Sequence, residues 1–235
     1  MTSQFPFKLG RRAALTALVG LAFSAQAQDI IRIVVPFGAG AVQDTVARTF
    51  SNELGQELGA SVIVENKAGA GGTLGTSRVA QAKPDGKTLV LAAASHNLVA
   101  HLYSKLPYHP KEDFVGVSYL GRTGYVVGVS SASGITSVRD LIERAKKAPN
   151  ALNYASAGNG SASHLAAAAL AAQAGVELQH IPMKSTGDAT TELLAGRVEV
   201  VTGATIGMLA FEKDPRVKLL AYSGAKRSRF LPDLP

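Results

Sequence analysis

The chain has 235 residues, of which 46% are hydrophobic and 17% charged, so it can bury the core of one or two globular domains. It contains no cysteine, which excludes disulfide frameworks, zinc–thiolate sites, iron–sulfur clusters and cysteine nucleophiles. The formal net charge is +7, but the basic residues are scattered among acidic ones. Since no block of like charges occurs, we do not expect binding to nucleic acid.

The first 27 residues have the pattern of an export signal. Basic residues (Lys8, Arg11 and Arg12) precede an apolar run of eleven residues, and small residues lead up to Ala27. We expect cleavage after Ala27 and a mature protein in the periplasm, with both the general and the twin-arginine export routes open. The apolar run is too short for the ~20 residues that cross a bilayer core, so no membrane span is expected after cleavage.

Segments typical of strands and helices alternate along the rest of the chain. In the first half, apolar β-branched runs flank helical patterns in which apolar residues recur every four positions, as at Val42, Val46 and Phe50. The expected order there is strand 30–35, helix 42–58, strand 61–65, helix 73–82 and strand 88–93. This order predicts a parallel sheet with helices packed on its faces.

A similar pattern follows in the second half. We expect strands at 115–120, 125–130, 152–156, 178–182, 198–202 and 217–223, and helices at 137–148, 163–174 and 188–195. The segment 106–114 contains two prolines and interrupts the alternation, which marks it as a domain boundary. The predicted organisation is a first α/β lobe at 28–114, a second at 115–216, and a segment at 217–235 that returns toward the first lobe.

Glycine-rich loops join a strand to a helix in both halves. They are PFGAGAVQD (36–44), NYASAGNGSASHL (153–165) and a third loop, NKAGAGGTLG (66–75). Unpaired N–H groups and the positive end of the dipole at a helix N-terminus favour an anion. Such loops lie at the carboxyl ends of parallel strands, where open α/β folds bind ligands. The structural alternative is that they are tight turns, in which Ser161 or Ser163 caps a helix and His164 packs.

These loops, together with VIVENKAGAGG, KPDGKTLVLA, LPYHPKEDF and the closing AKRSRFLPDLP, resemble the Bug receptor family. Its members are the substrate-binding proteins of tripartite tricarboxylate transporters, and the resemblance extends from about Ile30 to Pro235. It implies a two-lobed α/β fold of the periplasmic-binding-protein kind, a type II-like Venus flytrap. Family members continue beyond LPDLP with elements that complete the first lobe, so we expect a chain shortened at its C-terminus with that lobe incomplete.

The resemblance also implies a function. The two lobes would grip a small carboxylate (a dicarboxylate, an acidic amino acid or an aromatic acid) and deliver it to a membrane permease, with no catalysis, cofactor or metal. The residues expected to bind the ligand are Phe37, Ala39, Gly40, Asp44, Ser95, Ser156, Gly158, Asn159, Gly160, Ser161 and His164. We expect Asp44 to act indirectly, for example through water, because its charge repels a carboxylate.

Two enzyme classes remain as alternatives. The first is an exported dinucleotide-dependent oxidoreductase, because Gly38-Ala39-Gly40 opens a helix and Glu65 ends the second strand where a ribose-binding acid would lie. However, the third glycine of that motif is missing and Asp44 would repel a pyrophosphate. The second is a secreted hydrolase, but the chain lacks the G-x-S-x-G nucleophile elbow and an HExxH motif. A non-catalytic receptor is therefore the prediction.

Overall fold

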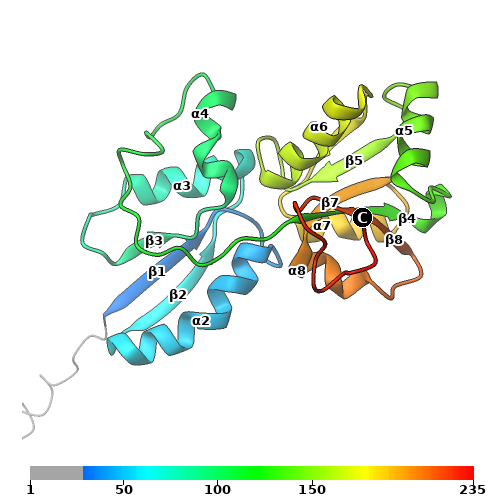
Figure 1. The fold of residues 1–235 in the computed structure, drawn as a ribbon. Helices are drawn as coiled ribbons and strands as arrows, with labels where there is room; N and C mark the ends of the chain where they lie inside the picture. The colour runs from blue at the N-terminus through cyan, green and yellow to red at the C-terminus, as the bar shows by residue number, and fades with distance from the viewer. Residues whose placement is uncertain (1–28) are drawn as a thin grey trace, which may run out of the picture.

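The computed structural model describes residues 29–235, and the predicted export signal with its cleavage point lies outside them. Two β-sheets form the centres of two lobes that lie side by side (Figure 1). A segment without regular structure, residues 103–124, crosses from the first lobe to the second. Within residues 29–235 there is no helix with the length and apolar character that crossing a membrane requires.

Lobe 1 is a three-stranded parallel sheet with helices packed against it. Its strands are β1 (Ile30–Val35), β2 (Ser61–Asn66) and β3 (Thr88–Val90), in the order β2-β1-β3. Its helical elements are α2 (Val42–Leu58), η1 (Ala70–Gly72), α3 (Thr73–Ala80), η2 (Ala94–Asn97) and α4 (Val99–Leu102). The central strand β1 supplies the core residues Ile33 and Val35, which pack with Phe37 and Ala47. This parallel lobe confirms the order predicted from periodicity.

Lobe 2 has a five-stranded sheet in the order β6-β5-β7-β4-β8. Its strands are β4 (Tyr125–Ser130), β5 (Asn153–Ser156), β6 (Gln179–Pro182), β7 (Val200–Ala204) and β8 (Val217–Tyr222). Its helical elements are η3 (Ser131–Ser133), α5 (Val138–Lys147), α6 (Ala162–Ala174), α7 (Thr186–Leu194), α8 (Thr205–Met208) and η4 (Leu209–Phe211). Strand β4 runs antiparallel to both neighbours, so this sheet is mixed rather than parallel.

Serine side chains begin the three longest helices of lobe 2. Ser137, Ser161 and Ser185 each accept a hydrogen bond from the backbone N–H three residues later. Such N-caps satisfy one of the N–H groups that a helix start leaves without an intrahelical partner. The helix starts at 138, 162 and 186 therefore follow from local sequence, and of the two serines considered as the cap of α6, Ser161 is the one that caps it.

The C-terminal segment corrects one prediction. The strand at 217–223 was expected to return toward lobe 1, but β8 pairs antiparallel with β4 in the sheet of lobe 2. The chain then stays with that lobe, since Tyr222 N–H donates to Pro235 O at 2.9 Å and Leu231 packs with Val126 and Met208. The reason is that β4 has an edge free for pairing, and the apolar side chains of 217–222 complete the core on that side.

The predicted strand at 115–120 is also wrong. These residues have no regular secondary structure, and Val115, Val117 and Tyr119 are 90%, 78% and 76% exposed. The alternation of apolar side chains is typical of a strand, but a strand also requires a partner for its backbone groups. Within the described residues no strand pairs with this segment.

Candidate functional site

The first glycine loop turns tightly between β1 and α2. Phe37 is buried in the core of lobe 1, whereas Ala39 and Gly40 are exposed at the tip of the loop. Gly40 has φ = +78°, a conformation that residues with a side chain rarely adopt. Its N–H donates to Asp44 Oδ2 at 3.1 Å, so this amide already has an acceptor within the protein.

Asp44 has several partners in this loop. Its side chain is 7% exposed, and Oδ1 accepts a hydrogen bond from Arg48 Nε at 2.9 Å. Burial by itself raises the pKa of Asp44, but hydrogen bonds from Gly40, Asn66 and Arg48 outweigh it and hold that pKa below its ordinary value. Asp44 is therefore a charged anchor for the start of α2, and its expected indirect contact with a ligand stays a prediction.

The second glycine loop joins β5 to α6 and is held by hydrogen bonds of its own. Gly158 and Gly160 have φ values of +106° and +76°. The Gly158 N–H donates to Ser156 Oγ at 3.1 Å, and the Gly160 N–H donates to His164 Nδ1 at 3.2 Å. Ser161 caps α6 by accepting from the His164 N–H. The two glycine amides thus have acceptors within the loop, and Asn159 is exposed at its tip.

Three stacked rings lie beneath this loop. The rings of His164 and His180 are 4.3 Å apart, and Tyr154 stacks on His180 at 4.7 Å. His180 Nε2 lies 2.6 Å from the Oγ of Ser156, which is fully buried. Burial, and next the proximity of His164, lowers the pKa of His180 to about 4; burial also lowers the pKa of His164. Both rings are therefore neutral at neutral pH and serve as acceptors or donors of ordinary hydrogen bonds.

His180 was not among the residues expected from the sequence. It joins the site because β5 and β6 pair in parallel with Tyr154 opposite His180. Side chains directly opposite each other on neighbouring strands lie on the same face of the sheet. The sequence predicted both strands, but the pairing of Tyr154 with His180 follows only when the register of the two strands is known.

The loops of the two lobes touch each other. Gly38 N–H donates to Lys184 O at 3.2 Å, and Tyr103 Oη donates to Asn159 O at 2.9 Å. A Cβ atom placed on Gly71 would lie 1.9 Å from Asn159 O, so the two backbones are in direct contact there. The three predicted glycine loops, far apart in sequence, therefore converge where lobe 1 meets lobe 2.

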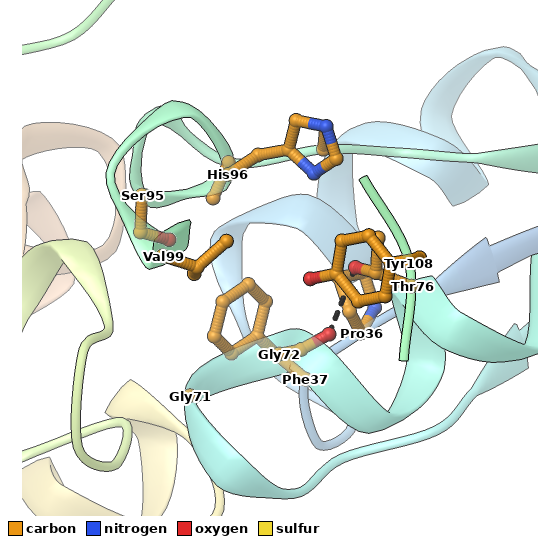
Figure 2. A pocket seen from close by; sticks show the side chains of 11 residues that line it. Pro36, Phe37, Gly71, Gly72, Thr76, Ser95, His96, Val99 and Tyr108 are labelled. Carbon is orange, nitrogen blue, oxygen red and sulfur yellow. Dashed lines mark hydrogen bonds between the residues drawn. The ribbon is translucent and has the colours of Figure 1, made fainter. Parts of the chain in front are cut away.

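A small cavity lies in lobe 1 next to this contact (Figure 2). Its volume is about 10 Å³, which is room for one water molecule. Figure 2 shows the side chains of Phe37, Ser95, Val99 and Tyr108 gathered around it, and His96 is also among the lining residues. Ser95 is 3% exposed and lines this cavity together with Phe37, and its element η2 also contacts α6, the helix that follows the second glycine loop. Within residues 29–235 no group of three or more acidic or histidine side chains could hold a metal ion.

Residues 46–235 match the family model described as the tripartite tricarboxylate transporter family receptor. A relative from Pseudomonas sp. (strain P51), the "UPF0065 protein in tcbD-tcbE intergenic region", is 34% identical over 236 residues, covering 97% of this chain and 70% of the relative.

Solved structures agree with this match. MatC from Rhodopseudomonas palustris with bound malate is 30% identical with a TM-score of 0.84, covering 88% of this chain and 71% of MatC. The periplasmic binding protein BugD is 35% identical with a TM-score of 0.80, covering 88% of this chain and 69% of BugD. The two-lobed periplasmic-binding-protein fold expected from the sequence is therefore confirmed. The chain belongs to the receptor family of the tripartite tricarboxylate transporters.

Proposed function

We propose that this protein is an exported receptor that binds a small carboxylate between its two lobes and delivers it to the membrane permease of a tripartite tricarboxylate transporter. Its periplasmic location would follow from cleavage of the signal after Ala27. Membership of the receptor family and the malate bound to the similar MatC support the carboxylate as ligand. The observation that carries the proposal is the convergence of the glycine loops where the lobes meet. Gly38 of the first loop donates to Lys184 O of lobe 2, and Asn159 of the second loop lies against Gly71 of the third. The first and second loops each stand at the carboxyl end of a parallel strand and at the start of a helix.

The exposed loop tips are proposed to meet the ligand first. Ala39 and Asn159 lie at the tips, and the positive ends of the α2 and α6 dipoles favour a negative charge beside them. The amides of Gly40 and Gly160 shape these tips but donate within the protein. The proposed walls of the site are formed by the remaining expected residues, Phe37, Asp44, Ser95, Ser156, Gly158, Ser161 and His164.

A thermal-shift screen tests this proposal. The mature protein would be heated alone and with malate, succinate, aspartate, glutamate or benzoate, each at millimolar concentration. A ligand present at 100 times its Kd stabilises the fold by about 2.7 kcal/mol, which raises Tm by roughly 5–11 °C in a chain of this size. At least one acid should produce such a shift, and the uncharged amide succinamide should not. No shift with any acid, or chemical turnover of the bound acid, would contradict the proposal.

A further inference from the structure

One peptide of the second glycine loop is held at both ends. The Asn159 carbonyl accepts a hydrogen bond from Tyr103 Oη of lobe 1 at 2.9 Å. The N–H of the same peptide, on Gly160, donates to His164 Nδ1 of lobe 2 at 3.2 Å. Because the C=O and N–H of a planar trans peptide point in opposite directions, these two bonds together fix its orientation. His164 thus presents the Asn159 carbonyl to the other lobe.

Lobe 1 surrounds this peptide on more than one side. A Cβ atom on Gly160 would lie 3.2 Å from Leu102 Cδ1 and 3.3 Å from the Tyr103 ring. On another side, a Cβ atom on Gly71 would lie 1.9 Å from Asn159 O. Atoms cannot approach so closely, so a side chain at position 71 is incompatible with this arrangement of the lobes. Gly71 is therefore required for the contact itself, in addition to its own φ of +64°.

We propose that Tyr103, Leu102 and Gly71 form a clasp on the Asn159–Gly160 peptide that holds the two lobes together through protein atoms alone. The Asn159 carbonyl oxygen that the clasp uses is an acceptor, whereas a carboxylate ligand requires hydrogen-bond donors. Of the donors that could meet an anion, the clasp therefore occupies the Tyr103 O–H alone. In a two-lobed receptor, both walls of the site are assembled only in molecules whose lobes have closed at the hinge. Because the clasp stabilises the closed arrangement, it raises the fraction of molecules that are ready to bind.

Two variants remove parts of the clasp. Tyr103→Phe deletes one hydroxyl and keeps the ring against Gly160. Loss of one hydrogen bond of ordinary strength changes an equilibrium constant by about 2- to 13-fold. The ratio of closed to open molecules should therefore fall by this factor. Gly71→Ala should abolish the closed population, because its Cβ cannot be accommodated beside Asn159 O.

Each variant has a matched control. Tyr119→Phe removes a hydroxyl from a tyrosine that is 76% exposed in the crossing segment. Gly86→Ala introduces the same methyl group at a glycine of lobe 1 with φ = +77°, where a Cβ would meet nothing within 4 Å. Gly86→Ala therefore imposes the same backbone strain as Gly71→Ala without a clash between the lobes.

Distances between the lobes give the readout. Because the chain has no cysteine, Glu57→Cys on α2 and Lys146→Cys on α5 provide two exposed sites for spin labels, one in each lobe. Double electron–electron resonance on the ligand-free protein should show a short-distance population in the labelled parent and in both controls. This population should shrink in Tyr103→Phe and disappear in Gly71→Ala, while circular dichroism remains that of a folded chain.

Equal short-distance populations in the parent and in Tyr103→Phe would overturn the clasp. So would a loss of this population in Gly86→Ala as complete as in Gly71→Ala, because backbone strain alone would then explain it. Only the effect of the clasp on ligand binding rests on the proposed function. The distances are measured without ligand, so they decide the clasp even if every acid in the thermal-shift screen fails to bind.

Discussion

Replacing Asp44 shows whether this residue supports the first loop or contacts the ligand. Asp44→Ala removes the acceptors of the Gly40 N–H and of Arg48. The hydrogen bond from the Gly40 N–H is accepted by the buried, charged carboxylate of Asp44 and contributes about 1.5–3 kcal/mol. The second involves an arginine whose side chain is 53% exposed, so it adds only about 0.3–0.5 kcal/mol. The free energy of unfolding should therefore fall by about 2–3.5 kcal/mol, and by about half as much in Asp44→Asn, which keeps an oxygen for Gly40.

The effect should depend on pH. The pKa of Asp44 is lower in the folded protein than its ordinary value, so the folded state binds this proton less readily than the unfolded state. Such a carboxyl stabilises the fold above the unfolded-state pKa of about 4, and its contribution is lost as pH falls through the folded-state pKa. Urea unfolding followed by circular dichroism should show the full difference between wild type and Asp44→Ala at pH 7, and a smaller one at pH 3.

The opposite pattern would refute this reasoning. If Asp44→Ala unfolded at the same urea concentration as the wild type but no longer bound an acid found in the thermal-shift screen, Asp44 would be a ligand contact. A loss of stability as large at pH 3 as at pH 7 would show that the charge of Asp44 has no part in it.

Two further changes test lobe 2. A Cβ atom on Gly124 would lie 2.2 Å from the Tyr222 ring, so Gly124→Ala should lower stability by about 1–3 kcal/mol in urea unfolding. Gly116→Ala, where a Cβ meets nothing within 4 Å, should be neutral, and equal losses would contradict the packing argument. An NMR titration of His180 should give a pKa of about 4, with stability lost as pH falls from about 6.5 to 4 in the wild type. This loss should be smaller in His180→Phe, in which only His164 of the two histidines contributes to it. A His180 pKa near 6.5 would contradict the buried, neutral stack.

Local patterns predicted many of the elements. The strand 30–35 and the helix 42–58 have the predicted bounds, because a buried β-branched run and a four-residue apolar repeat each determine one type of element. The start of α5 also follows from sequence, since Ser137 and Asp140 stand at capping spacing and Ser137 Oγ accepts from the Asp140 N–H at 3.1 Å.

Features that depend on distant partners were not predicted. The alternation at 115–120 is that of a strand, but pairing depends on residues elsewhere, and β8 pairs with β4 rather than with lobe 1. His180 entered the site through the register of β5 and β6. Gly71 was read only as part of a loop, because its contact with Asn159 exists only once two lobes meet. Sequence periodicity describes one element at a time and carries no information on strand pairing, strand register or contacts between the lobes.

Hydrogen exchange measured by mass spectrometry tests the central proposal, a carboxylate bound between the lobes, most directly. The mature protein would be compared with and without the acid that gives the largest thermal shift. A ligand gripped between the lobes should slow exchange in peptides covering both 36–44 and 156–164, one loop from each lobe. Slower exchange in only one of these loops, or only in segments remote from both, would contradict the interlobe site.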